Sequence, residues 1–187
     1  TKRGDALSSI VWSETKTNFD AKRVCTNVII NSGIPLKDLE KINESNGCEI
    51  EEIVSEKGYK VVRKVVLPDE KEILEKEMIN MCDNLEVNLL LTTGGTGFSP
   101  RDITPEATKA VIEREALGIA EAIRYYSLQI TKRAMLSRAT SGIRKNTVII
   151  NLPGSPKACR EALDFVLDDV KHGIEILLGQ AKECARK

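Results

Sequence analysis

The stretch that decides the fold is VNLLLTTGGTGFSPRD, residues 87–102. Its first seven residues, VNLLLTT, contain three successive leucines and no charged residue, as expected for a central parallel strand that is covered on both faces. Three glycines follow at 94, 95 and 97, and Thr104-Pro105-Glu106 then restarts a helix. Thr104 is suited to the N-cap, Pro105 to the first helical position and Glu106 to the positive end of the helix dipole. We therefore expect a buried strand, a glycine-rich loop and a helix in succession.

Strand and helix signals alternate on both sides of this stretch. Gly58 follows an apolar spacing typical of a helix, and Pro68 ends a short run rich in β-branched residues. Asp69 can cap the next helix, and Ser155-Pro156 repeats the cap-and-proline signature. We expect helices at 49–57, 69–84, 104–116, 119–132 and after Ser155, and strands at 59–67, 87–93 and 146–151. This alternation predicts an α/β fold with a mostly parallel central sheet and helices on both faces.

Composition excludes several classes of protein. Lys and Arg together number 28, as do Asp and Glu, so the formal net charge is zero, whereas a nucleic-acid-binding protein normally carries a basic excess. No apolar run approaches the roughly 18 residues that span a bilayer, and the first residues do not resemble a signal peptide. The five cysteines are scattered and the single histidine stands alone, so neither disulfides nor a zinc site is indicated. We expect a cytoplasmic protein with no nucleic-acid or membrane partner.

Polar loops follow the predicted strands, at the edge of a parallel sheet where ligands bind. The glycine loop 94–102 can close its backbone N–H groups around anionic oxygens, although a purely structural glycine turn remains an alternative. Asp69 and Asp102 flank that loop. Two carboxylates beside a phosphate site repel the phosphate unless a cation lies between them, which favours Mg²⁺. The alternative roles are an N-cap for Asp69 and a cap or turn for Asp102.

A second anion-binding geometry is indicated near the end of the predicted strand 146–151. Ser137 and Arg138 precede that strand, and Asn151-Leu152-Pro153-Gly154-Ser155 leads from it into a helix N-terminus. We therefore expect the Asn151 amide and the Ser155 hydroxyl to face the same crevice. Each basic residue of this region, taken singly, is better explained as a solvated surface charge.

Residues 48–187 resemble the molybdopterin-binding domain family, and most closely its adenylyltransferase branch, which includes the corresponding domain of gephyrin. The resemblance is carried by LLLTTGGTGFSPRDITPEAT (89–108), MLSR (135–138), GIRKNTVIINLPGSPKA (142–158) and PDE (68–70). It implies a cytoplasmic homotrimer that uses Mg²⁺ to transfer AMP from ATP to the terminal phosphate of molybdopterin, with release of pyrophosphate. Hand-over of the product to a molybdate-inserting enzyme is a further implication.

The resemblance also implies roles for individual residues. Asp69 and Asp102 match the family's essential aspartates, which makes them the expected catalytic and metal-binding residues. The residues expected to bind nucleotide or pterin are Gly94, Gly95, Thr96, Gly97, Ser127, Ser137, Asn151, Pro153, Gly154 and Ser155. Two alternatives remain: a pterin-binding scaffold domain without turnover, and another enzyme on the same domain, for molybdate insertion or pyridine-nucleotide deamidation.

The N-terminal segment departs from the family. We place the family domain at 47–187 and treat 1–46 as a segment of uncertain origin, because no obvious opening strand leads into the helix at 49. Strand-like character occurs around residues 28–30, and IVWSE at 10–14 could replace the family's first strand. AKRVCTNVIINSGIPLKDL (21–39) weakly resembles the tail of a sulfurase-type molybdenum-cofactor domain. A fusion with such a domain and a chain of non-contiguous segments are both compatible with this.

Overall fold

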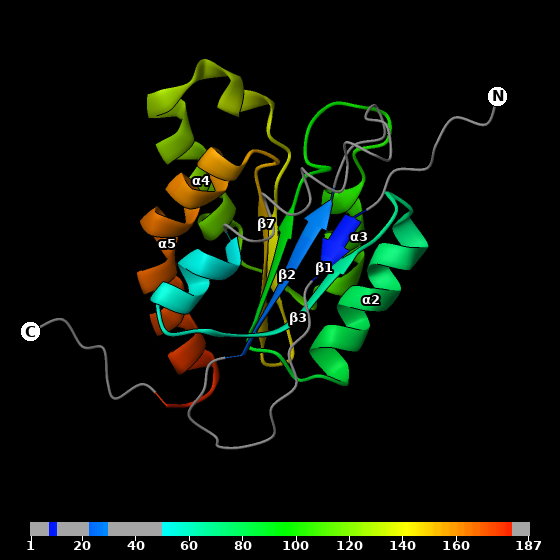
Figure 1. The fold of residues 1–187 in the computed structure, drawn as a ribbon, viewed down its shortest axis with the longest axis vertical. Helices are drawn as coiled ribbons and strands as arrows, with labels where there is room; N and C mark the ends of the chain where they lie inside the picture. Colours follow the sequence, from blue (N-terminus) through cyan, green and yellow to red (C-terminus); the bar gives the residue numbers. More distant parts are fainter. Residues whose placement is uncertain (1–7, 11–22, 30–49, 181–187) are drawn as a thin grey trace, which may run out of the picture.

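A computed structural model describes residues 8–10, 23–29 and 50–180 of the chain. These residues form one seven-stranded sheet in the order β1-β3-β2-β4-β7-β6-β5 (Figure 1). The strands are β1 (Ser8–Ile10), β2 (Arg23–Ile29), β3 (Lys60–Val66), β4 (Leu89–Thr93), β5 (Arg114–Glu115), β6 (Ser141–Arg144) and β7 (Thr147–Leu152). The predicted strands 59–67, 87–93 and 146–151 are confirmed as β3, β4 and β7.

The sheet is parallel at its centre and antiparallel at its edges. β3, β2, β4 and β7 pair in parallel, whereas β1, β6 and β5 pair in antiparallel fashion. The expectation of a mostly parallel sheet therefore holds for the centre and is wrong at the edges. The reason on one side is a two-residue turn: Lys145-Asn146 joins β6 to β7, and so tight a turn can connect only antiparallel strands. Lys145 adopts the positive φ of 48° that such a turn demands.

Strands from the segment 1–46 are part of this sheet. β2 lies between β3 and β4 at its centre, and β1 pairs with β2 and β3. The strand-like character around residues 28–30 coincides with the end of β2, which begins at Arg23. The proposed origin of the segment stays a prediction, and residues 11–14 and 30–47 lie outside the described residues.

Helices cover both faces of the sheet, as predicted (Figure 1). One face carries α2 (Lys71–Asp83) and α3 (Thr104–Val111); the other carries the helical residues 50–56, α4 (Leu117–Ile130) and α5 (Pro156–Leu177). Successive β4 side chains alternate between the two cores: Leu89 and Leu91 pack with α5, and Leu90 packs with α2. The predicted helix 104–116 ends early, at Val111, because residues 114–115 pair as β5 with β6.

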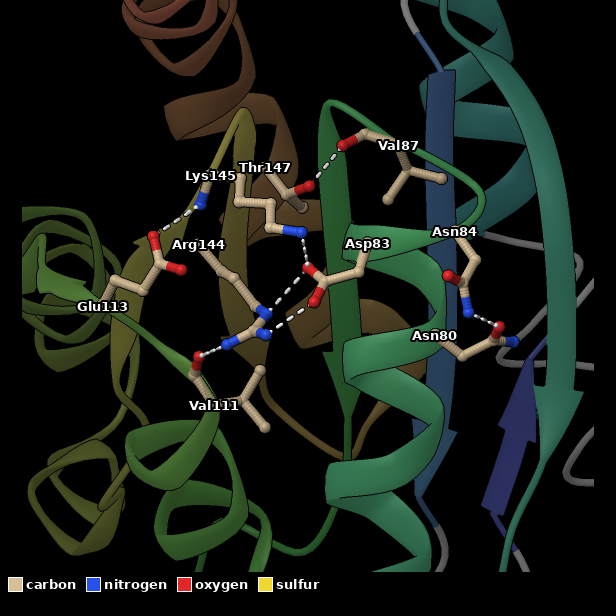
Figure 2. A network of polar contacts seen from close by, with 9 residues as sticks. All are labelled: Asn80, Asp83, Asn84, Val87, Val111, Glu113, Arg144, Lys145 and Thr147. Carbon is tan, nitrogen blue, oxygen red and sulfur yellow. Dashed lines mark hydrogen bonds and ion pairs between the residues drawn. The ribbon is translucent and has the colours of Figure 1, made fainter.

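A polar network fastens the end of the sheet at which β4 begins (Figure 2). Asp83, the last residue of α2, accepts hydrogen bonds from Arg144 Nε at 3.0 Å and Arg144 Nη2 at 2.6 Å. Arg144 Nη1 also donates to the carbonyl oxygen of Val111, and Lys145 Nζ lies 3.2 Å from Asp83 Oδ1. These cations hold the pKa of Asp83 below its ordinary value, chiefly through the Arg144 hydrogen bonds. The network ties the β6–β7 hairpin to α2 and α3.

Candidate active site

Two loops meet at the opposite end of the sheet, beyond the carboxyl ends of β4 and β7. Thr93 pairs with Leu152, so the chain leaves both strands side by side. Gly94 and Gly95 follow β4 with φ of 86° and 61°, which side chains rarely adopt. A Cβ built on Gly154 would lie 3.4 Å from Gly94 Cα. The predicted convergence of 94–97 with 153–155 is therefore present.

The glycine loop has its carbonyl groups tied to the protein. Gly95 O accepts from Thr104 N at 3.2 Å, Thr96 O from Arg138 N at 2.8 Å, and Gly97 O from Arg138 Nε at 2.7 Å. Among the described residues, none accepts a hydrogen bond from the N–H groups of residues 95–97. Gly94, Gly95 and Thr96 are buried, and the loop reaches the surface from Gly97 onward. Unbonded amides beside anchored carbonyls are suited to an anion.

The start of α3 differs from the sequence-based expectation. Ile103, not Thr104, occupies the N-cap, and no side chain closes this helix end. Thr104 is fully buried, and its Oγ1 has no hydrogen-bond partner among the described residues. The positive end of α3 therefore remains uncapped next to the glycine loop, which adds to the attraction for an anion.

The Asp69 carboxylate is buried, and none of the described residues donates a hydrogen bond to it. It was expected as a possible N-cap of α2, but Glu70 holds that position and no side chain caps the helix. Both carboxylate oxygens of Asp69 are buried and accept no hydrogen bond from any described residue. Burial, followed by repulsion from Asp102, raises the pKa of Asp69 from 3.8 to about 7; nearby Arg101 acts in the opposite direction. The two aspartates predicted to act together are thus electrostatically coupled.

Asp102 combines a local role with its place beside Asp69. Its Oδ2 accepts the Ser99 N–H at 3.0 Å, which makes it a turn-forming residue, as the alternative interpretation held. It is 7% exposed, and a Cβ on Gly97 would come within 2.9 Å of Oδ2. The carboxylate therefore lies directly against the glycine loop.

The donor set at this position fits Mg²⁺. Orphaned carboxylate oxygens of Asp69 beside a second carboxylate are hard oxygen ligands. Within the described ranges, no group of three or more His, Cys, Asp or Glu side chains could hold a metal ion. A cation here would thus take one or two carboxylates and complete its shell with water and phosphate oxygens, which is the usual binding mode of Mg²⁺.

Asn151 lies at the end of β7 but is turned into the protein. It is fully buried, and Nδ2 donates to Thr92 Oγ1 at 2.8 Å and Thr108 Oγ1 at 2.9 Å. Its Oδ1 accepts from Thr140 N at 3.1 Å. Both amide hydrogens are used, so the side chain braces β4, α3 and residue 140 against one another. Direct contact of Asn151 with a ligand stays a prediction.

The remaining predicted residues occupy different positions. Ser155 is the N-cap of α5, and its Oγ accepts from Ala158 N at 3.2 Å. Ser137 Oγ accepts from Ala139 N at 3.3 Å, and the chain at this point lies next to the glycine loop. The carbonyl of Pro153 accepts a hydrogen bond from Cys159 Sγ at 2.9 Å. Ser127 lies within α4, and among the described residues no hydrogen bond or ion pair joins its side chain to the loop.

Sequence reasoning passed over two arginines near this edge. The sequence alone favours a surface charge for Arg138, yet its side chain binds Gly97, Asp102 and Glu106, in the glycine loop and α3. Arg124 of α4 donates to the carbonyls of Ser137 at 3.1 Å and Ala139 at 2.8 Å. The MLSR motif was a signal for Arg138. Nothing in the local sequence singles out Arg124, because its partners lie 13 and 15 residues away.

The chain is similar to proteins of molybdenum cofactor synthesis. A family model described as a probable molybdopterin binding domain matches residues 24–172, a range that includes nearly all of β2. The molybdopterin adenylyltransferase of Helicobacter pylori strain J99 is 43% identical over 122 residues, or 65% of this chain and 69% of that protein. The molybdopterin adenylyltransferase of Escherichia coli K12 is 45% identical over 113 residues, or 58% of each chain.

Solved structures show the same fold. A molybdopterin biosynthesis protein from Mycobacterium abscessus superposes with a TM-score of 0.72 at 32% identity, covering 85% of this chain and 97% of that one. The Mog protein from Mycobacterium ulcerans gives 0.69 at 29% identity, covering 88% and 100%. None of the helices in the described part of the chain has the length and apolar character to cross a membrane.

The family model accounts for most of the chain, and its range, residues 24–172, includes the acid pair and the glycine loop. This chain therefore belongs to the molybdopterin-binding domain family of molybdenum cofactor biosynthesis, in which its curated relatives include molybdopterin adenylyltransferases.

Proposed function

We propose that this protein transfers AMP from ATP to the terminal phosphate of molybdopterin and releases pyrophosphate. The observation that carries the proposal is the buried pair Asp69 and Asp102 beside a loop in which the amides of residues 95–97 donate to no described residue. Such a site suits two polyanions that need a cation and fixed donors between them. The names of the relatives indicate the same substrates.

The chemistry follows from charge. An oxygen of the molybdopterin phosphate attacks the α-phosphorus of ATP, the bond to the oxygen that bridges the α- and β-phosphates breaks, and pyrophosphate departs with that oxygen. Both reactants are anionic, so the main task of the protein is positioning and charge stabilisation. Mg²⁺ held at Asp69 and Asp102 would supply positive charge for the phosphates and for the departing pyrophosphate. No covalent bond to the protein is required.

Each segment of the site has a proposed part in binding. The amides of residues 94–97 and the uncapped start of α3 bind phosphate oxygens. The loop of Pro153, Gly154 and Ser155 forms the neighbouring wall, and Ser137 contributes a hydroxyl at its margin. Asn151 acts by holding these segments together, and Ser127 is assigned to the outer part of the pocket.

The test is adenylyl transfer by the Asp102→Asn variant. Asparagine keeps the size of the side chain and an oxygen that can accept the Ser99 N–H, so the variant is expected to fold and to bind molybdopterin. It loses the charge, and we expect transfer to fall by about 100-fold or more. The assay mixes protein, ATP, Mg²⁺ and molybdopterin and measures adenylylated pterin and pyrophosphate.

The matched control is Asp164→Asn, the same change at an exposed position of α5. Its turnover should equal that of the unaltered protein. Unchanged turnover in Asp102→Asn would refute the assigned role. If the unaltered protein binds molybdopterin without releasing pyrophosphate from ATP, it is instead a pterin-binding scaffold.

The oligomer that we propose is a homotrimer in the cytoplasm. Large apolar side chains gather on α4 and on the 3₁₀ helix η1 (Lys132–Leu136) that follows it. Tyr125, Leu128, Ile130, Met135 and Leu136 are all exposed, between 37% and 67%. Exposed apolar residues concentrated on two successive helices favour contact with another protein surface. A later encounter with a molybdate-inserting enzyme belongs to the same proposal.

A further inference from the structure

The Arg138 side chain is an anchoring point for the glycine loop. Its Nε donates to Gly97 O at 2.7 Å, Nη2 donates to the carbonyl oxygen of Asp102, and Nη1 binds the carboxylate of Glu106. Its backbone N–H donates to Thr96 O at 2.8 Å. One residue thus contacts the middle of the loop, its end and the first turn of α3.

These contacts determine which way the loop amides point. In a trans peptide the C=O of one residue and the N–H of the next point in opposite directions. Fixing the carbonyls of Thr96 and Gly97 toward Arg138 therefore turns the N–H groups of Gly97 and Phe98 away from it. Among the described residues, no group accepts a hydrogen bond from either N–H. The orientation that suits an anion is produced by Arg138.

The segment that bears Arg138 is itself held. Arg124 on α4 donates to the carbonyls of Ser137 and Ala139, the residues on either side of Arg138. Arg124 thus fixes the backbone from which Arg138 reaches the loop. The guanidinium needs both a planar fork and a charge for this arrangement, because it serves two carbonyls and one carboxylate at once.

We propose that Arg138 is a positioning residue that keeps the loop 95–102 and the backbone of Asp102 in the conformation competent for adenylyl transfer. Its Nε, Nη1 and Nη2 each contact a protein group, so its action is assigned to the loop, and the experiment below distinguishes this from contact with phosphate. The inference rests on the proposed function for its effect on turnover. The effect on the loop itself does not depend on any substrate.

The experiment measures hydrogen exchange and turnover in Arg138→Gln and Arg138→Lys. Amide exchange is followed at Ser99, Asp102 and Thr104, whose N–H groups are bonded only while the loop keeps its shape. We expect exchange at these amides to accelerate by about 10-fold or more in both variants, while amides of β4 and α5 keep their wild-type rates. Adenylyl transfer, as kcat/KM for ATP, should fall by about 10- to 100-fold.

Two further variants serve as controls. Arg114→Gln makes the same change at an exposed arginine of β5 and should match the unaltered protein in exchange and turnover. Glu106→Gln removes only the charge that faces Nη1 and should accelerate loop exchange by a smaller factor than Arg138→Gln. If Arg138→Gln does not fold, Arg138→Lys and Glu106→Gln decide the question, and wild-type loop exchange in both refutes the proposal.

Two other outcomes would overturn the positioning role, and a third would overturn only the proposed function. Unchanged loop exchange with reduced turnover would show that Arg138 contacts substrate, which overturns the positioning role. Exchange that rises equally in β4 and α5 would show a general loss of stability and also overturns it. If the unaltered protein fails to transfer AMP while Arg138→Gln loosens the loop selectively, the positioning role stands and the proposed function falls.

Discussion

Asp69 presents a buried carboxylate to which no described residue donates a hydrogen bond. Its pKa is raised from 3.8 to about 7, mainly by burial and then by Asp102. In the unfolded chain the proton is lost near pH 3.8, whereas the folded protein retains it until about pH 7. Over this interval the folded state binds more protons, so the contribution of Asp69 to stability is greatest at low pH and declines as the pH rises.

Replacement of Asp69 by Asn should abolish this decline. Without divalent cations, the melting temperature of Asp69→Asn should exceed that of the unaltered protein at pH 8, and the two should converge near pH 4. Mg²⁺ at pH 8 should stabilise the unaltered protein more than the variant, because the proposed Mg²⁺ site needs the ionised acid pair. Thermal unfolding between pH 4 and 8 is the measurement, with Asp164→Asn as control. Parallel pH profiles for Asp69→Asn and the unaltered protein would contradict the assignment.

The contribution of Asp83 to stability depends on pH in the opposite direction to that of Asp69. Its pKa lies below the ordinary value because Arg144 and Lys145 favour the ionised form. The associated stability is present above the pKa of the unfolded state and disappears as the pH falls through the lower pKa of the folded state. Asp83→Asn should therefore lower the free energy of unfolding by about 1–2 kcal/mol at pH 7.

The same comparison at a pH below the ordinary pKa of the carboxyl group should show a smaller difference, because the stabilisation is lost as the carboxylate becomes protonated. Urea unfolding at the two pH values measures it. Adenylyl transfer should be unaffected, since the network lies at the end of the sheet remote from the glycine loop. An equal loss of stability at both pH values would show that packing, not charge, accounts for the effect.

At the scale of single elements, the absence of a side chain at Gly97 leaves room for the carboxylate of Asp102. A Cβ on Gly97 would lie 2.9 Å from Asp102 Oδ2, so Gly97→Ala must displace the carboxylate. We expect transfer to fall by about 10-fold or more, because small errors of placement are costly at such sites. Stability should change by less than about 1 kcal/mol, since the loop reaches the surface here.

Gly173→Ala is the matched control within α5. No atom lies within 4 Å of the added Cβ, and the position is helical and exposed. It should raise the free energy of unfolding by about 0.5–1 kcal/mol and leave transfer unchanged. Kinetics and urea unfolding of both variants provide the check. Normal turnover in Gly97→Ala would show that the carboxylate tolerates displacement.

The elements that local sequence determines were the ones predicted. α5 begins at Ser155-Pro156, where a capping hydroxyl and a proline coincide, and β4 begins with the three leucines 89–91 that predicted a buried strand. β5 and β6 have only two and four residues, too few for a periodic signal, and their pairing determines them: β6 with β7, and β5 with β6. The N-cap at Ile103 was not predictable either, because the favourable Thr104 is drawn into the first turn, where its N–H bonds Gly95 O.

The candidate site likewise has features that the sequence predicted and features that it did not. The order of strands and loops was enough to predict that Asp69 and Asp102 lie near each other. The unpartnered state of Asp69 and the inward turn of Asn151 depend on packing between elements that are far apart in sequence. The contacts of Arg138 span 32 to 41 residues, so local spacing contains no signal for them.

For the whole molecule, the exposed apolar run on α4 and η1 predicts the oligomer. Leu136→Glu should shift the proposed trimer toward the monomer, because a buried unpaired charge is costly at an interface. Sedimentation equilibrium gives the mass directly. The control Ile176→Glu alters a side chain on α5 that is 56% exposed and should leave the mass unchanged. Equal masses for the unaltered protein and Leu136→Glu would exclude this surface as the interface.

The wide spacing of the loop contacts has a consequence for synthesis on the ribosome. Thr96 and Gly97 are translated well before Arg138, and β4 receives its neighbour β7 later still. At elongation rates of about 5–20 residues per second, Arg138 is added several seconds after the glycine loop has been synthesised. A ribosome stalled before the Arg138 codon would display β4 and its loop with no guanidinium to hold them. The loop therefore acquires its final shape only after Arg138 and β7 have emerged.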